Sequence, residues 1–492
     1  MRGGPKPVWL ILAALALPAL PAAALDAPPP ATTHLLARDR SVAPAPPAAD
    51  RDTLNLSLDD AVLLASERGE EMRAARAFIT QTEGRVREEL ARALPQLSAT
   101  VTYDRKLSSI YQDIGSQDSM FGDLFKNSPF AAKHTWTADL VGSQLLWSGG
   151  KVGAALGAAR AAHRSAHASE REVASDLVAQ VKEAYYDAAY TQRLVEIAQG
   201  ALDQAREHLR QVKSGQREGS KSEYEQLRAE VDASNQEPAL VAAERGREIA
   251  LLALKRLVNV PVEQPLVLAR PLEFSGGLIP IVTEKAPSPA ARPALAAADL
   301  EVEARRQVVR VYRGQYWPDL TISSTVSHQA FPEDMLPARR QFRRNWDAYL
   351  TLAVPIFNGL RTEGQSAQAR GDFEKARADR DRLREAVTIE TAQARADLDH
   401  SLSTLAARRQ TVRQARRAWE LAGVRYTNGM STQLEVSDAR LQLQSAEVNE
   451  VQATRDYLVA LAQLERAVGH PVTVVRKTLD EATKSLNMEG TH

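Results

Sequence analysis

The chain of 492 residues contains one pattern written twice, and this internal duplication constrains its fold more than any other feature. A stretch ending in QLLWSGGK matches a later stretch ending in PIFNGLR. Trp147 therefore corresponds to Phe357 and Gly149 to Gly359, each pair 210 positions apart. A repeat of this length is too long for a solenoid unit. It indicates two copies of one half-protein.

The offset of 210 continues without a gap through the second part of each copy. Gly219 in KSGQREGS matches Gly429 in TNGMS, and LKRLVNVPV matches LERAVGHPV. Upstream, Pro95 in LPQL matches Pro318 in WPDL at an offset of 223, so one loop of the first copy is longer by 13 residues. The predicted domains are a first repeat over 54–262, a proline-rich linker over 263–291, a second repeat over 292–475 and a C-terminal tail over 476–492.

The N-terminus predicts export. An apolar run broken by Pro18 and Pro21 is followed by the small residues Ala22 and Ala24, which is typical of a secretory signal peptide and argues against a membrane-anchoring helix. No other segment approaches the roughly 20 apolar residues of a spanning helix. We expect a signal peptide over 1–24 and a leader rich in Pro and Ala over 25–53.

Each repeat predicts one very long helix. The segments 149–213 and 360–423 lack proline and carry apolar residues at helical spacing, and at 1.5 Å per residue each would be roughly 100 Å long. A glycine-containing turn ends each segment, and a helix of roughly 35 residues returns. Shorter helices are expected before each long one, over 70–93 and 293–315. Two short helices end to end would match one long helix.

Segments between the helices alternate apolar and polar residues, as in QLSATVTYDR and DLTISSTVSH, and this period of two predicts strands. Their length and the aromatic residues near their ends are typical of outer-membrane strands. We expect four strands, near 96–106, 135–147, 319–329 and 345–357, with outward loops over 107–134 and 331–344. The aromatic residues expected at the membrane interface are Tyr103, Trp136 and Trp346. Four strands cannot close a barrel in lipid, so the barrel must be shared between chains.

Over nearly all of 54–475, the sequence resembles the TolC family of outer-membrane factors. The resemblance rests on the duplicated helices and hairpins, on LPQL and WPDL before the strands, on LLWSGG and PIFNGL after them, and on RYTNGMSTQLEVSDARLQLQSAE. The resemblance implies a mainly α fold with a transmembrane β part. Three copies would form a 12-stranded barrel in the outer membrane of a Gram-negative-type cell and a periplasmic α-helical barrel. A periplasmic adaptor and an inner-membrane transporter would be the partners. The duplicated corner at Trp147, Gly149, Phe357 and Gly359 would then join strand to helix, with glycine relaxing the backbone limits there.

The resemblance also assigns site residues. It places acidic rings at the periplasmic constriction, and the matching positions carry Glu435 and Asp438, where the first copy has Glu225 and Arg228. Residues three apart share a helix face, and Arg425 or Arg440 could tie this hairpin shut. The adaptor-docking tips would contain Gly219, Gly429 and Met430. The implied function is the passive exit duct of an efflux pump for drugs, metals or other small molecules, with type I protein secretion as the alternative.

Other classes of function have little support. The formal net charge of zero and the lack of basic stretches interleaved with aromatics argue against nucleic acid, and the absence of cysteine removes thiolate sites and a lipidated cysteine. No catalytic motif or cofactor is predicted. His163 and His167 are four apart but lack a third ligand, so a solvated helix face is favoured over a metal site. A periplasmic coiled coil remains the alternative structural class. Pro238 is expected to kink or break its helix.

Overall fold

The computed structural model of the protein describes residues 53–108, 132–269, 278–282 and 291–478. The signal peptide expected over 1–24, almost all of the expected leader and most of the loop expected over 107–134 lie outside these residues. Asp52–His492 form one compact unit, to which all the elements named here belong.

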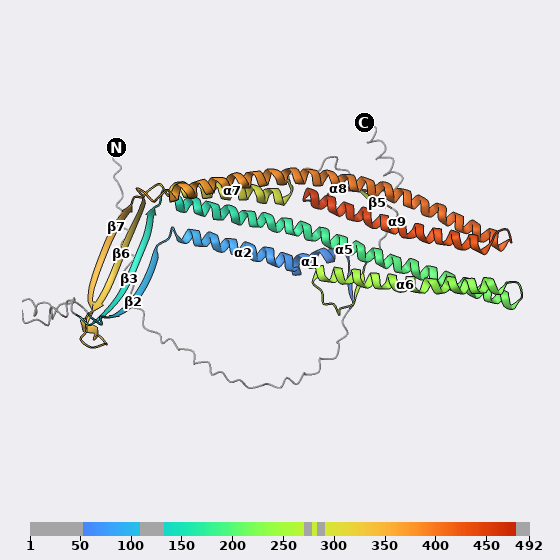
Figure 1. The fold of residues 1–492 in the computed structure, drawn as a ribbon, viewed down its shortest axis with the longest axis horizontal. Helices are drawn as coiled ribbons and strands as arrows, with labels where there is room; N and C mark the ends of the chain where they lie inside the picture. Colours follow the sequence, from blue (N-terminus) through green and yellow to red (C-terminus); the bar gives the residue numbers. More distant parts are fainter. Residues whose placement is uncertain (1–52, 109–131, 270–277, 283–290, 479–492) are drawn as a thin grey trace, which may run out of the picture. The chain divides into compact units, whose positions relative to one another are not determined.

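The helices occur in matching pairs in the two halves of this unit. α5 and α8 have 67 residues each, α6 and α9 have 36, and α2 and α7 have 22. α2 and α6 pack against α5, and α7 and α9 pack against α8, so two shorter helices flank each long one as expected (Figure 1). The bounds are α1 Leu58–Arg68, α2 Glu70–Ala91, α5 Lys151–Arg217, α6 Glu223–Val258, α7 Pro293–Gly314, α8 Arg361–Thr427 and α9 Gln433–Val468.

Local signals set the limits of the returning helices. Ser222 caps α6 in a reciprocal capping box with Glu225, and the side chain of Thr432 caps α9. Both helices end at a residue in the left-handed conformation, Asn259 in α6 and Gly469 in α9. The two helices therefore start and stop at corresponding positions because the sequence repeats the same cap chemistry.

Of the kink or break expected at Pro238, the break does not occur. α6 runs from Glu223 to Val258 with Pro238 inside it. Proline removes one backbone N–H from the helical ladder, but extensive packing of α6 against α5 supports the turns on both sides. Tertiary packing thus overrides the local penalty at this position.

Four strands form one antiparallel sheet in the order β2-β3-β6-β7. The fourth strand ends at residue 353 and not at 357 as expected, because Pro355 lacks the N–H that a strand ladder requires. Within each hairpin the register is the same: Gln96 pairs with Ser143, and the corresponding Asp319 pairs with Ala353. The bounds are β2 Gln96–Arg105, β3 His134–Trp147, β6 Asp319–Ala330 and β7 Arg343–Ala353. A short 3-10 helix, η4 (Arg339–Gln341), lies between β6 and β7.

Short strands also pair in two places where the sequence predicted only a linker and a tail. β1 (Leu54–Leu56) pairs in parallel with β4 (Leu266–Leu268), and β5 (Leu278–Val282) pairs antiparallel with β8 (Val474–Thr478). Part of the linker expected over 263–291 and the start of the tail expected from 476 are therefore ordered strands. Runs of only three to five residues carry too little periodicity to identify them in advance.

Two apolar clusters hold these strands to the helices at corresponding places. Leu254 and Val258 of α6 are fully buried in one cluster, and Leu464 and Val468 of α9 are fully buried in the other. Each cluster contains a buried tyrosine whose hydroxyl donates to a strand carbonyl; Tyr185 donates to Leu56. The two repeats thus have separate small cores that share the same two buried positions on the returning helix, as expected of a chain that is thin in large apolar residues.

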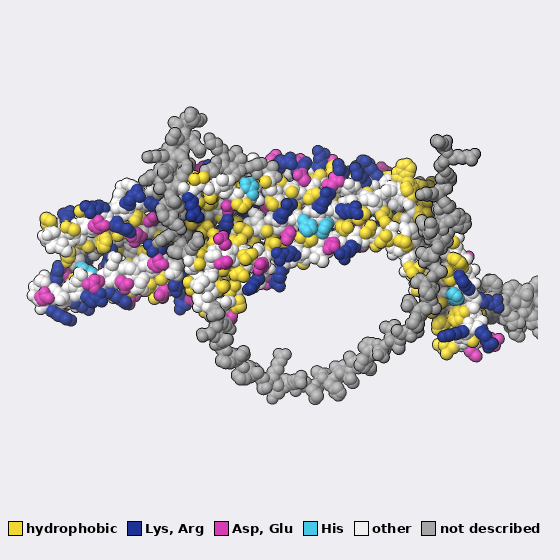
Figure 2. Space-filling view, turned by 180° about the vertical axis from the view of Figure 1, so that it is seen from behind, with side chains coloured by type: hydrophobic (Ala, Val, Ile, Leu, Met, Phe, Trp, Pro, Cys, Tyr) yellow, Lys and Arg dark blue, Asp and Glu magenta, His cyan; other side chains and the backbone are white. Residues whose placement is uncertain are grey.

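Charged side chains cover much of the helical surface, and hydrophobic side chains gather where the helices meet the strands (Figure 2). In the part of the chain that the structure describes, none of the helices combines the length and the apolar character needed to cross a membrane.

Candidate functional site

The turns that join the paired helices have the same geometry in both repeats. Gly219 and Gly429 adopt φ values of +75° and +72°, which favour glycine. The amide of Ser220 donates to the carbonyl of Gly215 at 2.8 Å, and that of Met430 donates to the carbonyl of Arg425 at 2.8 Å. The side chain of Met430 is exposed. These turns, the helical tips, are therefore duplicated features with solvent around them.

Lys221 connects the two tips. Its ammonium donates a hydrogen bond of 2.6 Å to the hydroxyl of Tyr426 in the other repeat and lies 4.7 Å from the centre of that ring. It also lies 3.3 Å from the carboxylate of Glu225. The hydrogen bond to Tyr426, more than any other cause, raises the pKa of Lys221. The lysine is therefore held in its charged form at the junction of the two helical hairpins.

A second group of cross-repeat contacts lies further along the hairpins. Arg440 of α9 forms an ion pair with Asp232 of α6, and the arginine side chain is nearly buried. The imidazole of His208 on α5 is 2.7 Å from the amide nitrogen of Gln433 on α9. Burial and, second, the Arg440 guanidinium lower the pKa of His208, while Asp232 raises it. Neutral imidazole is thus the favoured form between the two repeats.

The predicted gate acids, Glu435 and Asp438, both have exposed side chains in the first turns of α9. Neither carboxylate forms an ion pair with any residue that the structure describes. Arg440, one predicted gate partner, pairs with Asp232 instead, and Arg425 donates to the carbonyl of Met430 at 3.4 Å. The structure therefore leaves the two acids accessible, and their role as a gate stays a prediction.

Sequence reasoning missed most of the residues that connect the tips. Each of them occupies a position at which the two repeats differ: Lys221 corresponds to Ser431, Tyr426 to Gln216, His208 to Ala418, Gln433 to Glu223, Asp232 to Gln442 and Arg440 to Glu230. Residues that act between two repeats experience different surroundings in each copy. Positions near the tip glycines at which the two repeats carry different residues were the signal that could have identified these connecting residues.

At the strand-to-helix junction of the first repeat, Gly149 is enclosed. Its φ is +59°, and a Cβ there would lie 2.4 Å from Cβ of Trp317 and 2.8 Å from the carbonyl oxygen of Gly314. Trp147 packs edge-on against Trp317 with 6.2 Å between ring centres. Lys151 and Asp319 form an ion pair of 2.7 Å beside them. This junction is therefore a packed corner made by both repeats.

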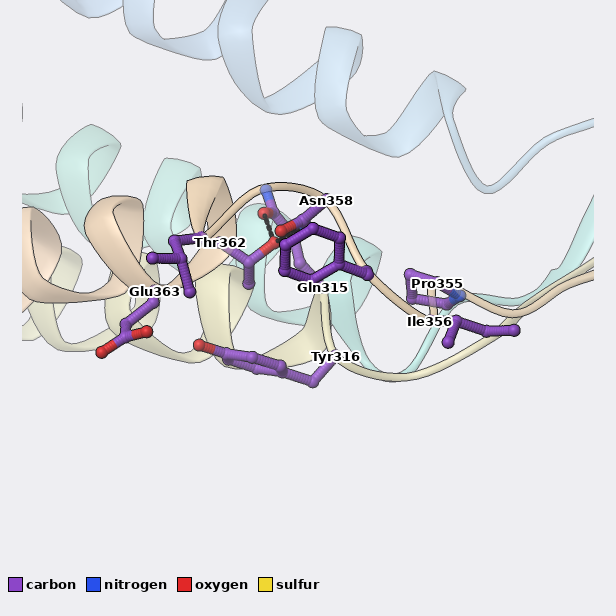
Figure 3. Close-up of a pocket in the computed structure, with 9 residues that line it drawn as sticks. Gln315, Tyr316, Pro355, Ile356, Asn358, Thr362 and Glu363 are labelled. Carbon is purple, nitrogen blue, oxygen red and sulfur yellow. Dashed lines mark hydrogen bonds between the residues drawn. The ribbon is translucent and has the colours of Figure 1, made fainter.

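The junction of the second repeat is open by comparison. Gly359 has a φ of +65° and no atom within 4 Å of a Cβ built on it, and Phe357 is 81% exposed. A cavity of about 170 Å³ lies beside it, between the turn at Tyr316 and the start of α8 (Figure 3). There the amide of Asn358 donates to the hydroxyl of Thr362. The same sequence corner is thus packed in one repeat and exposed in the other.

The predicted interface aromatics lie near the loop ends of the strands. Tyr103 pairs with Trp136 across β2 and β3, with 4.9 Å between ring centres. The indole of Trp136 donates to the carbonyl of Met335, and that of Trp346 donates to the hydroxyl of Ser324 at 2.9 Å. Their polar atoms are therefore bonded within the protein while the rings cover strand surface.

His163 and His167, for which a metal site was not favoured, contact neighbouring side chains in the structure. His163 of α5 hydrogen-bonds with Thr82 of α2 at 3.1 Å, and its ring lies edge-on to that of His167. Within the described ranges, no group of three or more potential ligands is arranged to hold a metal ion.

Comparison with known proteins places both repeats in one family. Residues 62–260 and 289–470 match the family described as outer membrane efflux protein. The pyoverdine export outer membrane protein OpmQ of Pseudomonas aeruginosa is 26% identical over 428 residues, which cover 84% of this chain and 85% of OpmQ. The cobalt-zinc-cadmium resistance protein CzcC of Cupriavidus metallidurans is 25% identical over 304 residues, which cover 60% of this chain and 68% of CzcC.

Solved structures show the same fold. The outer membrane protein VceC of Vibrio cholerae superposes with a TM-score of 0.67 and 20% identity, over 84% of this chain and 96% of VceC. Because the family match spans both repeats and well over half of the residues, the chain belongs to the outer membrane efflux protein family.

Proposed function

We propose that three copies of this outer-membrane efflux protein form a continuous exit duct, with strands crossing the outer membrane and long helices lining a tunnel in the periplasm. The single observation that carries the proposal is the four-stranded sheet, whose outer strands β2 and β7 lack a further partner strand in the described part of the chain. Lipid cannot satisfy open strand edges. Four strands from each of three copies would close a barrel of 12, within the range of such barrels.

The surface of the strands supports a position in lipid. Val101, Leu350 and Leu352 are 70%, 62% and 61% exposed, which is unfavourable in water and favourable in hydrocarbon. Trp346 lies on the same face of β7 as the two leucines, since alternate residues share a face. We assign the interface aromatics to the boundary between lipid and water, as is usual for barrels.

The tips lie at the opposite ends of the long helices, roughly 100 Å from the strands. Gly219, Gly429 and Met430 are the proposed contacts with a periplasmic adaptor, which would connect the duct to an inner-membrane transporter. The exposed Met430 side chain supports this assignment, since methionine adapts its shape to a partner surface.

The contacts between the hairpins support a closed periplasmic end. Lys221 with Tyr426, and Arg440 with Asp232, each join the first repeat to the second near the tips. Opening a tunnel between these hairpins would require both contacts to separate. Glu435 and Asp438 are exposed at the same level and are proposed to form a ring of six carboxylates in three copies. Such a ring would favour cations.

The names of two relatives support small solutes as cargo. One relative is named for export of pyoverdine and another for resistance to cobalt, zinc and cadmium. We propose efflux of small molecules or metal ions in preference to secretion of proteins.

The test of the proposal is assembly. Detergent-extracted protein from the outer-membrane fraction should have the mass of three chains, and heating should convert it to monomer with loss of strand signal in circular dichroism. A monomer that keeps its full strand content in detergent would refute the proposal.

The tip contacts can be tested on the same material. Lys221→Met should increase single-channel conductance in planar bilayers, since it removes the bond to Tyr426. Lys213→Met is the matched control, because Lys213 pairs with Glu230 within one hairpin at 3.0 Å. Equal conductance of the two variants would argue against Lys221 as a closing contact.

A further inference from the structure

We infer that the lipid-facing side of the sheet binds phosphate groups of lipid in the outer leaflet of the outer membrane, through one arginine and one histidine on each hairpin. Arg105 lies directly opposite His134 in the first hairpin, and Arg344 lies directly opposite His328 in the second. These are the two Arg–His pairs. The inference rests on the proposed position of the sheet in the membrane and adds a class of lipid and the residues that hold it.

The two Arg–His pairs are counterparts in the duplicated chain. Arg105 corresponds to His328 at the offset of 223 that relates β2 to β6, and His134 corresponds to Arg344 at the offset of 210 that relates β3 to β7. The arginine and the histidine have therefore exchanged strands, while each hairpin keeps one of each at the same level. The adjacent Asp104 corresponds to Ser327, so the charge next to the pair is not kept.

The first pair lies on the face assigned to lipid. Alternate residues of a strand share a face, so Arg105 lies on the same face of β2 as Val101 and Tyr103. Directly opposite residues of an antiparallel pair also share a face, which places His134 there. The side chain of Arg105 is exposed. The first pair is therefore one step beyond Tyr103, toward the loop.

The second pair has the same position in its hairpin. Arg344 is exposed and shares a face of β7 with Trp346 and Leu350. Its guanidinium lies 5.3 Å from the centre of the Trp346 ring, which agrees with this placement. The exposed His328 lies opposite Arg344 on β6. Both pairs thus lie at the loop end of the lipid face, beside an aromatic residue.

The four strands of this sheet carry their carboxylates on the other face. The alternation of residues places all of them there: Asp104, Asp139, Asp319 and Asp347. On the lipid face of the same strands, the two Arg–His pairs are the only basic side chains. Neither arginine forms an ion pair with any residue that the structure describes. The anion that suits these pairs must therefore come from outside the sheet.

The chemistry of each pair fits a phosphate group. The planar fork of arginine matches two phosphate oxygens, and side chains directly opposite each other have Cβ atoms only about 5 Å apart. The hydroxyl of Tyr103 lies 2.8 Å from Nδ1 of His134. With that hydroxyl as the donor, the ring hydrogen of His134 is on Nε2 and can be donated to an anion beside Arg105. Cationic groups directly opposite each other repel, and a bound phosphate removes this repulsion.

The position of the pairs favours lipid over cargo. Cargo would pass along the opposite face of the sheet, which lines the proposed duct. The pairs lie next to the aromatic residues that mark the boundary of the hydrocarbon layer, and clusters of basic residues at such a boundary bind anionic lipid head groups. At the helix end of the strands, Lys151 is already neutralised by Asp319 at 2.7 Å. The loop end is therefore the phosphate-binding end of this face.

Native mass spectrometry of the detergent-solubilised trimer measures lipid binding. The probe is lipid A, a glycolipid with two phosphates, and its dephosphorylated form is the comparison. We expect the dephosphorylated form to bind at least fivefold more weakly than lipid A. Arg105→Gln combined with Arg344→Gln should weaken the binding of lipid A at least fivefold and leave the binding of the dephosphorylated form unchanged.

Arg343→Gln is the matched control for Arg344→Gln. The two arginines are adjacent and both exposed, and each substitution removes one positive charge, but Arg343 lies on the opposite face. Arg344→Gln should halve the number of lipid A molecules retained by the trimer, because one of the two pairs is lost, and Arg343→Gln should leave that number unchanged. Arg344→Lys should give an intermediate number, since lysine keeps the charge without the fork. Equal losses in Arg343→Gln and Arg344→Gln would overturn the inference.

Inorganic phosphate distinguishes a lipid site from a site for free anions. A tenfold excess of inorganic phosphate over lipid A should not displace the lipid, because the acyl chains bind the apolar surface of the strands as well. Displacement by inorganic phosphate would assign the pairs to free anions and overturn the assignment to lipid.

The outcomes separate the inference from the proposed function. A trimer that binds lipid A and its dephosphorylated form equally overturns the inference and leaves the duct intact. A protein that is monomeric in detergent overturns the proposed assembly and, with it, the position of the pairs in lipid. The comparison of the two lipids uses the native chain, so it decides the inference even if a variant fails to fold.

Discussion

Replacing Gly149 by alanine tests the packed strand-to-helix corner. Gly149 and Gly150 are adjacent and both have positive φ, at +59° and +80°. A Cβ on Gly149 would collide with Cβ of Trp317, whereas a Cβ on Gly150 would meet nothing within 4 Å. Gly150→Ala is therefore a matched control that carries the backbone strain without the collision. In the second repeat, Leu360 occupies the position of Gly150 at a φ of +66°, so a side chain is tolerated there.

The expected losses of unfolding free energy in Gly149→Ala and Gly150→Ala differ only by the cost of the collision. A left-handed conformation costs a non-glycine residue roughly 1–2 kcal/mol, and both variants incur this cost. Overpacking against rigid neighbours adds roughly 1–3 kcal/mol, and only Gly149→Ala incurs it, because the atoms in its way are a Cβ and a backbone carbonyl. We expect Gly149→Ala to lower the free energy of unfolding by roughly 2–5 kcal/mol and Gly150→Ala by roughly 1–2 kcal/mol.

Denaturant unfolding in detergent, followed by far-UV circular dichroism, measures both variants. Trp147 and Trp317 form the corner itself, so a change in tryptophan fluorescence on substitution of Gly149 is a second readout of the affected contacts. Trp317→Leu in the Gly149→Ala background should not restore stability, since leucine keeps the Cβ that the alanine would meet at 2.4 Å and the Gly314 carbonyl remains at 2.8 Å. Equal destabilisation by Gly149→Ala and Gly150→Ala would refute the reasoning.

Three further predictions concern the tips. Glu435→Ala with Asp438→Ala should weaken cation selectivity and relieve block by divalent cations added on the periplasmic side of a planar bilayer; unchanged selectivity and block would mean that the acids do not form the constriction. Gly429→Trp should abolish export while the trimer and its membrane insertion persist, because a bulky side chain at the exposed turn interferes with the adaptor; normal export would exclude that turn from docking. The pKa of His208 lies below the ordinary value near 6.5. Neutral His208 therefore stabilises the closed tips above about pH 6.5, and this stabilisation is lost as the pH falls through the pKa of the folded state. The rate of amide hydrogen exchange in the first turns of α9, corrected for intrinsic rates, should therefore rise as the pH is lowered from 7.5 to 5.5. An equal rise in a His208→Gln variant would show that His208 is not the cause.

The sequence by itself determined the repeated elements. Proline-free helical spacing defined α5 and α8, glycines marked both tips, and period-two alternation located β2, β3, β6 and β7. These signals are local, because each depends on residues a few positions apart in the chain. The family could be identified for the same reason, since the elements keep their order and their offset of 210 through both copies.

Only the tertiary structure decided how the two repeats meet. Lys221 and Tyr426 are 205 positions apart, and Arg455 and Asp187 are 268 apart, so no local pattern brings them together. The short strands β1, β4, β5 and β8 likewise form only because their partners arrive from distant segments. Pro238 remains helical because α5 supports its surroundings. The physical reason is the same in each case: local periodicity specifies an element, but the partner of that element is chosen by long-range packing and charge.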